Sequence, residues 1–211
     1  MIKLIRGFKD ILPEETGLWQ HIEATAREIF ADFGYGEIRI PLLERTELFA
    51  RSIGTSTDIV EKEMYSFTDR NGSSLTLRPE ATASVVRAYV EHKLYARDPI
   101  QKLYTIGPMF RRERPQKGRH RQFYQINSEV FGLQDPRADA ELILLLMTFF
   151  GRLALSGIEL NLNCLGCTAC RPHFGEALTT FLEGHSQGLC ADCLRRRGQN
   201  PLRAFDCKVP T

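Results

Sequence analysis

The sequence predicts an α+β fold in which helices pack against an antiparallel sheet. Two pairs of strand-like runs, at 64–77 and 102–132, are each interrupted by turn-forming residues, which indicates two hairpins. Helical stretches are interspersed with these hairpins, and few strand–helix–strand units are present, which disfavours a parallel sheet. The 211 residues, 43% of them hydrophobic and 26% charged, suffice for one large domain with a buried core.

The composition also limits the classes of function. The formal net charge of +2 is nearly neutral, so any binding of nucleic acid must come from local clusters of charge. The N-terminal stretch lacks the apolar region and cleavage site of a signal peptide. The longest apolar run, Ile143–Phe150, is too short to span a membrane. We therefore expect a soluble, cytoplasmic protein without a membrane partner.

The first expected elements are a helix, a strand and a second helix. Apolar residues recur at helical spacing over Gly17–Phe33, and Gly34 and Gly36 end this helix. Residues 37–41 (EIRIP) then have the pattern of a strand that stops at a proline. Thr46–Ile53 is expected to form a short helix.

A hairpin and a third helix follow. Residues 64–77 alternate around an Asn-Gly pair at 71–72, which is a strong signal for a tight hairpin turn. A helix is predicted from Thr82 to Leu94, with Thr82 as its cap. Glu80 lies where the strand gives way to this helix. Its carboxylate either projects into a cleft or interacts with the dipole of the helix.

The segment 102–132 carries the strongest functional signal. Six of the eleven residues from Arg111 to Arg121 are Lys or Arg, and Pro115 and Gly118 exclude a helix there. Such a cationic loop between two strands suits the phosphates of a nucleotide or a nucleic acid, and the alternative is a solvated hairpin tip. Three polar residues in this segment must face a solvated cleft or find partners: Glu113, Gln125 and Glu129.

The C-terminal part of the chain differs in composition. A helix over Asp139–Leu155 and a strand over Ile158–Asn163 are expected to complete the larger domain, which we place at residues 1–163. Residues 164–211 contain all six cysteines of the chain. We expect this second part to be a Cys-rich helical appendage with a helix over Phe174–Leu182.

The spacing of these cysteines is typical of a metal site. Two C-x-x-C pairs with the spacing of zinc-ribbon-like sites predict a structural Zn²⁺ held by Cys167, Cys170, Cys190 and Cys193. In the cytoplasm disulfides are disfavoured, so a metal explains the pairs better. The alternative is a set of reduced, partly buried thiols. Residues that could replace one ligand are Cys164, Cys207, His173 and His185.

Several of these features together resemble a known family. The hairpin at 102–132, the segment RPEATA at 78–83 and the helix–strand–proline unit strongly resemble the catalytic core of histidyl-tRNA synthetase, a class II aminoacyl-tRNA synthetase. The residues at 34–41 are similar to motif 1, which in this family builds the dimer interface and ends in proline. The residues FRRE at 110–113, with the loop that follows, are similar to motif 2.

The resemblance implies a fold and an activity. The fold would be the class II antiparallel sheet flanked by helices, here incomplete at its C-terminal side. The activity would be ATP-dependent formation of histidyl-adenylate, with Mg²⁺ bound to ATP, followed by transfer of the histidyl group to tRNA(His). Because the carboxylate of histidine is already nucleophilic, this step needs positioning and charge neutralisation more than a base. The similarity to motif 1 implies a homodimer.

The resemblance also implies roles for individual residues. Arg111, which would hold the α-phosphate, and Gln125 are the implied catalytic residues. The residues implied in ATP binding are Arg111, Glu113, Arg121 and Phe123. Those implied in histidine binding are Glu80, Thr82, Gln125 and Glu129, with Glu129 accepting a hydrogen bond from the imidazole ring. At the loop tip, the residues expected to bind tRNA, or else the oxygens of pyrophosphate, are Arg114, Lys117 and Arg119.

One departure from the family pattern limits this expectation. No segment resembles motif 3, the second histidine-binding loop or the anticodon-binding domain. We therefore expect an N-terminal part of a longer enzyme that activates histidine weakly or not at all by itself. Two other functions are open: a regulatory paralogue, the ATP phosphoribosyltransferase regulatory subunit, and an inactive zinc-bearing tRNA-binding module. The intact basic loop favours the synthetase.

Overall fold

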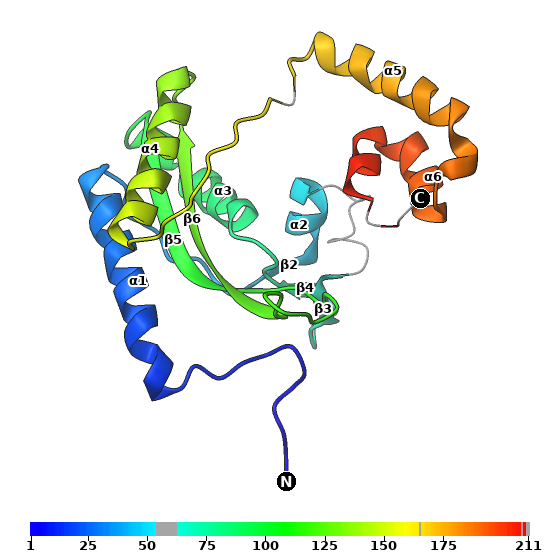
Figure 1. Ribbon diagram of the computed structural model, residues 1–211. Helices are drawn as coiled ribbons and strands as arrows, with labels where there is room; N and C mark the ends of the chain where they lie inside the picture. The colour runs from blue at the N-terminus through cyan, green and yellow to red at the C-terminus, as the bar shows by residue number, and fades with distance from the viewer. Residues whose placement is uncertain (54–62, 165, 208, 210–211) are drawn as a thin grey trace. The chain divides into compact units, whose positions relative to one another are not determined.

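The computed structural model describes residues 1–53, 63–164, 166–207 and 209 (Figure 1). The chain divides into two compact units, Met1–Ile158 and Glu159–Thr211. The sequence places the boundary after residue 163, which is inside the second unit. Within the described residues, none of the helices combines the length and apolarity that crossing a membrane requires.

The larger unit contains a three-stranded sheet that is central to its fold. Its strands lie in the order β1 (Gly36–Glu37), β5 (Gln101–Phe110) and β6 (Gln122–Phe131). β5 and β6 are antiparallel and paired over their full length, from Gln101 opposite Phe131 to Phe110 opposite Gln122. β1 runs parallel to β5. The predicted α+β fold is thus confirmed, and the expected hairpin at 102–132 is its longest pairing.

A second sheet of the same unit is antiparallel throughout. Its strands lie in the order β2 (Leu43–Arg45), β4 (Ser74–Leu77) and β3 (Tyr65–Thr68). The turn between β3 and β4 contains Gly72, whose φ of +83° needs a residue without a Cβ. The predicted hairpin at 64–77 therefore forms, and α2 (Thr46–Ile53) follows β2 where the sequence places it.

Helices cover both faces of the first sheet (Figure 1). α1 (Pro13–Asp32) and α4 (Pro136–Arg152) pack on one face, where the ring of Phe30 stacks on Tyr104 with centroids 4.2 Å apart. α3 (Thr82–Glu91), which the short helix η2 (Leu94–Ala96) follows, packs on the other face through a cluster that includes Leu103. Because side chains alternate along a strand, neighbours on β5 enter different cores.

The strand expected at 37–41 forms only at its beginning. Ile38 N donates to Tyr104 O at 2.8 Å, and the pairing ends there. The carbonyl oxygens of Ile40 and Pro41 instead accept hydrogen bonds from Nη1 of Arg78, at 2.9 and 3.4 Å. A side chain from a distant part of the chain thus takes the place of a neighbouring strand, which local sequence could not indicate.

Two further boundaries differ from expectation. The helix expected at 139–155 begins at Pro136, because Asp135 caps it by accepting a hydrogen bond from Arg137 N at 2.8 Å. The strand expected over 158–163 was wrong. Those residues have no regular structure, and no described strand pairs with them.

The smaller unit, Glu159–Thr211, is helical. It contains α5 (Cys170–Gly184) and α6 (Ala191–Gln199), with the 3-10 helices η3 (Ser186–Gly188) and η4 (Pro201–Asp206). The sequence predicted only the central part of α5. Among the described residues of this unit, the buried hydrophobic side chains are Leu178, Leu182 and Cys193.

Candidate active site

The candidate active site lies on the face of β6 that is turned toward α3. Phe123 packs against the cluster around α3, so Gln125 and Glu129, two and six residues further along the strand, lie on the same face. On β5, Gln125 is opposite Gly107 and Glu129 is opposite Leu103. The structure therefore places these two side chains on one face of β6, together with Asn127 and between the apolar side chains of Phe123 and Phe131.

A hydrogen bond joins this face of β6 to the first turn of α3. The hydroxyl of Thr82 donates to Glu129 Oε1 at 2.6 Å, and Asn127 Nδ2 donates to the same oxygen at 3.1 Å. Two of the residues expected to bind histidine are thus in direct contact. The expectation that Thr82 caps α3 was wrong, because its hydroxyl makes no cap hydrogen bond and is committed to Glu129.

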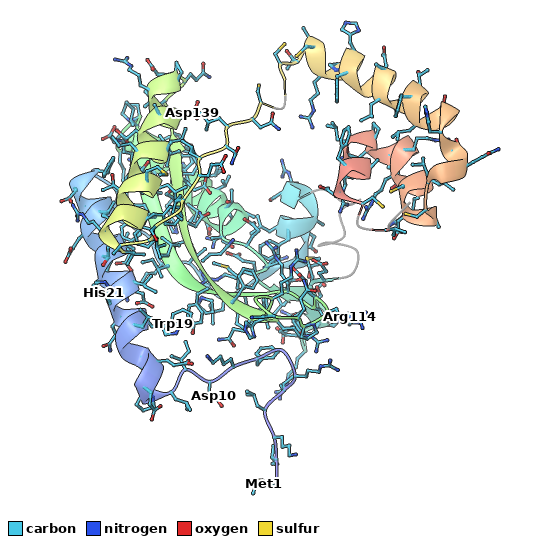
Figure 2. The ribbon with its side chains drawn as sticks, in the orientation of Figure 1. Met1, Asp10, Trp19, His21, Arg114 and Asp139 are labelled. Atoms are coloured by element: carbon cyan, nitrogen blue, oxygen red, sulfur yellow. The ribbon has the colours of Figure 1, made fainter. Side chains whose placement is uncertain are left out.

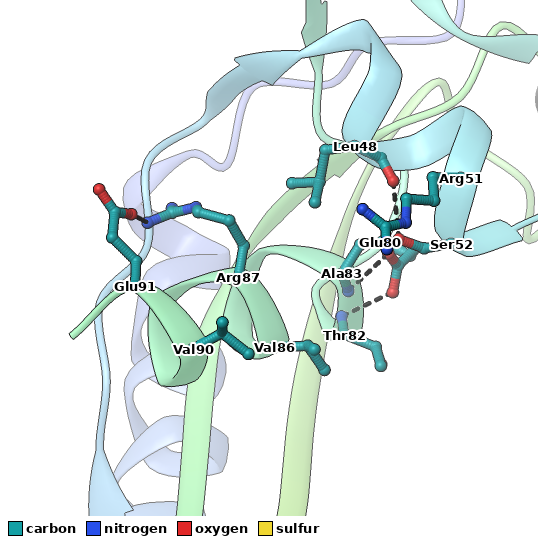
Figure 3. A pocket seen from close by; sticks show the side chains of 10 residues that line it. All are labelled: Leu48, Arg51, Ser52, Glu80, Thr82, Ala83, Val86, Arg87, Val90 and Glu91. Atoms are coloured by element: carbon teal, nitrogen blue, oxygen red, sulfur yellow. Dashed lines mark hydrogen bonds and ion pairs between the residues drawn. The ribbon is translucent and has the colours of Figure 1, made fainter. Parts of the chain in front are cut away.

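Glu80 supplies the cap instead. Its two carboxylate oxygens accept hydrogen bonds from the backbone N–H groups of Thr82 and Ala83, at 2.6 and 2.9 Å (Figure 3). A carboxylate at this position also interacts favourably with the positive end of the helix dipole. The interaction with the helix end, one of the two roles considered for Glu80, is therefore present in the structure.

Glu80 and Thr82 also line a pocket between α2 and α3 (Figure 3). The pocket has a volume of about 960 Å³. Apolar side chains form part of its wall, and charged groups stand among them. The other lining residues are Leu48, Arg51, Ser52, Ala83, Val86, Arg87, Val90 and Glu91. The first turn of α3 thus borders a cavity large enough for an amino acid.

Gln125 has a distinctive environment. Its Oε1 is buried and has no hydrogen-bond partner among the described residues. A buried polar atom without a partner costs free energy, about 1–3 kcal/mol in general, so native proteins keep few of them. An acceptor of this kind on the polar face of β6 is suited to a donor group that a ligand brings.

Arg111 lies at the end of β5 in a well-defined position. Its Nε donates to the backbone oxygen of Pro79 at 2.9 Å, and its guanidinium carbon lies 5.2 Å from the centroid of the Phe123 ring. Its Nη1 is 3.9 Å from Glu113 Oε1. These contacts hold the planar guanidinium in place while about a quarter (24%) of the side chain remains exposed, which suits recognition of an anion.

The loop after Arg111 folds back on itself. Gln116 and Arg119 form an isolated bridge around Gly118, whose φ is +78°. Glu113 pairs with Arg119 at 3.1 Å. Arg114 and Lys117 are exposed, and Arg114 lies at the loop end of the hairpin (Figure 2).

Arg121 connects the loop to the N-terminal segment. Its Nε donates to Glu113 O at 3.2 Å, its Nη1 donates to Arg6 O at 3.3 Å, and its backbone N donates to Gly7 O at 2.6 Å. Gly7 has a φ of +90°, and a Cβ there would come within 2.8 Å of the Arg121 side chain. Two donor groups of the Arg121 side chain, Nε and Nη1, are therefore already hydrogen-bonded to backbone oxygens. The sequence did not indicate these bonds.

Sequence reasoning missed the importance of Arg78. The side chain is only 3% exposed, and besides Ile40 and Pro41 it binds Pro108 O through Nε at 2.9 Å. Burial lowers the pKa of this arginine, against the attraction of Glu44. Its Nη2 lies so close to Gly107 that a Cβ on that glycine would be 2.4 Å away. The signal in the sequence was a cation at the end of the apolar run LTL, next to proline.

The structure does not bring the four expected zinc ligands together. The sulfurs of Cys167 and Cys170 lie 3.4 Å apart and are exposed. Among the described residues, one group of three or more candidate metal ligands has its ligand atoms close together, and it consists of Cys190, Cys193 and Cys207. Cys207 was considered only as a substitute, and it joins the second pair in place of the first.

Comparison with protein families gives one match over most of the chain. A family model described as histidyl-tRNA synthetase matches residues 7–169. The histidine–tRNA ligase of Desulforapulum autotrophicum is 67% identical over 210 residues, covering 100% of this chain and 49% of the relative. That of Geobacter sulfurreducens is 59% identical over 208 residues, covering 99% of this chain and 50% of the relative. The chain thus spans about half the length of the curated relatives it matches.

Solved structures agree with this match. The apo histidyl-tRNA synthetase of S. aureus is 38% identical, with a TM-score of 0.75 over 100% of this chain and 49% of that chain. A structure titled as an ATP phosphoribosyltransferase regulatory subunit/histidyl-tRNA synthetase from Bacillus halodurans is 26% identical. It has a TM-score of 0.63 and covers 74% of this chain and 39% of that chain.

Proposed function

Because the chain belongs to the histidyl-tRNA synthetase family, we propose that it takes part in the activation of histidine by ATP and the charging of tRNA(His). The observation that carries this proposal is the buried Oε1 of Gln125, which has no hydrogen-bond partner among the described residues and lies on the same strand face as Glu129. Histidine carries donors at its ammonium group and its imidazole ring. An amino acid with two such donors would satisfy both acceptors.

The histidine site would be formed by the residues around the contact between Thr82 and Glu129. Glu129 would accept a hydrogen bond from the imidazole, which excludes side chains that lack this donor. The ammonium group would approach Gln125, Thr82 and the carboxylate of Glu80. Glu80 keeps acceptor capacity because each carboxylate oxygen has more than one lone pair.

The ATP site would be formed around Arg111 and Phe123. In the proposed reaction, a carboxylate oxygen of histidine attacks the α-phosphorus, and the bond from that phosphorus to the pyrophosphate oxygen breaks. Arg111 supports this step because its guanidinium is held by Pro79 O and neutralises charge that develops on the phosphate. Mg²⁺ would enter with ATP and would offset the negative charge of its phosphates.

The loop at 111–121, with Phe123 just after it, would contact two substrates, ATP and tRNA. Phe123 would stack on the adenine, while Glu113 and Arg121 would add contacts to ATP. Glu113 is paired with Arg119, so Arg119 would have to leave it before Glu113 binds the adenine. Arg114, Lys117 and a released Arg119 would then contact the phosphates of tRNA.

Assembly and location complete the proposal. The resemblance of residues 34–41 to motif 1 supports a homodimer, and a monomeric mass in light scattering would count against an interface within this chain. A cytoplasmic location agrees with a tRNA substrate.

The regulatory paralogue is less favoured, because the family model and the relatives at 59–67% identity are described as histidyl-tRNA synthetase or histidine–tRNA ligase.

The proposal is tested by titrating the chain with histidine and with MgATP in a calorimeter. We expect Glu129→Gln to weaken histidine binding about tenfold or more, because the acceptor loses its charge. Arg111→Ala should weaken MgATP binding by a similar factor and leave histidine binding nearly unchanged. Arg114→Ala, in the exposed part of the loop, is the matched control and should bind both ligands like the wild type.

The outcome against the proposal is also defined. If the wild-type chain binds neither ligand, or if Glu129→Gln and Arg111→Ala bind both as the Arg114→Ala control does, these residues do not form the site.

A further inference from the structure

Three cysteines of the smaller unit converge although they come from different elements. The sulfur atoms of Cys190, Cys193 and Cys207 all lie within 4.8 Å of one another. The sulfurs of Cys190 and Cys207, 17 positions apart in the chain, are separated by 3.8 Å. We propose that these three thiolates form a Zn²⁺ site, with the fourth coordination position left for water or another ligand.

The distance between the sulfurs agrees with zinc coordination. Zn²⁺ binds thiolates at about 2.3 Å in tetrahedral geometry, which places two sulfurs on the same ion about 3.8 Å apart. The separation of Cys190 and Cys207 already has this value. The ligands are soft thiolates with no carboxylate in the group, which favours zinc over magnesium or calcium.

The local structure explains why the three sulfurs meet. Cys190 is the N-cap of α6, and Cys193 lies in its first turn, so the C-x-x-C spacing turns both sulfurs toward one side. Cys207 follows η4, which packs against α6. The N-terminal end of a nine-residue helix also favours thiolates, because its dipole is positive there.

The smaller unit has few buried hydrophobic side chains among its described residues. Its described residues bury only three hydrophobic side chains, Leu178, Leu182 and Cys193, and one of these is a member of the cluster. Small units with little core are commonly stabilised by a metal or by disulfides. A zinc ion would join the start of α6 to the end of η4, so that metal binding and folding of this region are coupled.

The proposed set differs from the two C-x-x-C pairs in a testable way. Cys167 and Cys170 are exposed and interact mainly with each other, and Cys164 is also exposed. These three lie outside the cluster. Substituting them should therefore leave the metal in place, whereas substituting a cluster member should remove it.

The whole chain is purified without added metal, and its zinc content is measured by inductively coupled plasma mass spectrometry. The wild type should contain about one zinc ion per chain. Cys190→Ser, Cys193→Ser and Cys207→Ser should each lose it. Cys164→Ser and the double variant Cys167→Ser/Cys170→Ser are the matched controls and should keep it. A wild-type chain without zinc, or a double variant that loses it, would overturn the proposal.

A second measurement guards against variants that lose zinc because they misfold. Co²⁺ is titrated into the metal-free chain, and the thiolate-to-cobalt charge-transfer absorption is recorded, whose intensity follows the number of bound thiolates. The wild type and the Cys167→Ser/Cys170→Ser variant should give equal intensities. A loss of about half in that variant would assign the ion to both C-x-x-C pairs. This result is independent of histidine and ATP binding, so it does not bear on the active site.

Discussion

The hydroxyl of Thr82 and the carboxylate of Glu129, 47 positions apart in the chain, form a 2.6 Å hydrogen bond that joins α3 to β6. Both residues are expected to bind histidine, so this contact aligns two parts of the candidate site before a substrate arrives. A hydrogen bond that pre-organises a site should also contribute to the stability of the unit that holds it.

This contribution can be isolated with a double-mutant cycle. Thr82→Ala, Glu129→Ala and the double variant are compared in urea denaturation, followed through the fluorescence of Trp19. This residue, which is labelled on α1 in Figure 2, is the only tryptophan of the chain. Its ring packs against Tyr124 in the larger unit. We expect a coupling energy of about 1 kcal/mol, since the acceptor is charged but the contact is partly exposed. Additive effects of the two substitutions would show that the hydrogen bond adds no stability.

Arg78→Lys should destabilise the larger unit by about 3 kcal/mol, because a lysine cannot replace the fork of donors to three backbone oxygens. The oxygens of Ile40, Pro41 and Pro108 would lose their partners in a buried region. The same denaturation experiment measures this change. Arg114→Lys, at an exposed position of the loop, should change the stability by less than about 0.5 kcal/mol. Equal effects at the two positions would contradict the role assigned to Arg78.

Gly107→Ala should also destabilise the unit, by roughly 1–3 kcal/mol, because the new Cβ would meet the Arg78 guanidinium. The nearest atom, Nη2 of Arg78, would be 2.4 Å away. Gly17→Ala is the control, and we expect it to change the stability in the opposite direction. Gly17 lies within α1 with no neighbour inside 4 Å of an added Cβ, so alanine there should stabilise by about 0.5–1 kcal/mol. A neutral Gly107→Ala variant would show that Arg78 can move aside without cost.

Tyr35 should make the stability depend on alkaline pH. Burial, and then the charge of Glu141, raise the pKa of its hydroxyl from 10.0 to about 12. The unfolded chain therefore releases this proton at lower pH than the folded chain. The proton adds no pH dependence to the stability of the fold below pH 10, and the stability falls as the pH rises from 10 toward 12. We expect Tyr35→Phe to lose less stability across this range, as measured by far-ultraviolet circular dichroism in urea.

At pH 7 the Tyr35→Phe variant should be at least as stable as the wild type. The hydroxyl of Tyr35 is buried without a hydrogen-bond partner among the described residues, so removing it relieves a cost. Tyr95→Phe, at a position that is 49% exposed, is the control and should keep the alkaline dependence of the wild type. If both variants lose stability equally between pH 10 and 12, the burial of Tyr35 has no such effect.

The regular parts of the fold were predictable because their signals are local. Alternation over 102–132 predicted the β5–β6 hairpin, and the Asn-Gly pair predicted the turn between β3 and β4. The strand expected at 158–163 was not found, since a short apolar run adopts a strand only where another strand can pair with it. The resemblance to histidyl-tRNA synthetase was confirmed by the family match.

The sequence by itself determined which residues are candidates for the chemistry: the polar positions of β6, the basic loop at 111–121 and the cysteines. Only the tertiary structure decided which of them meet. The tertiary structure forms the hydrogen bond between Thr82 and Glu129 and places the Arg78 guanidinium against Gly107. It also brings the sulfur of Cys207 close to those of Cys190 and Cys193. Local patterns set the direction of a side chain from its own strand or helix. Contacts between distant positions depend on how those elements pack, and no local pattern records that packing.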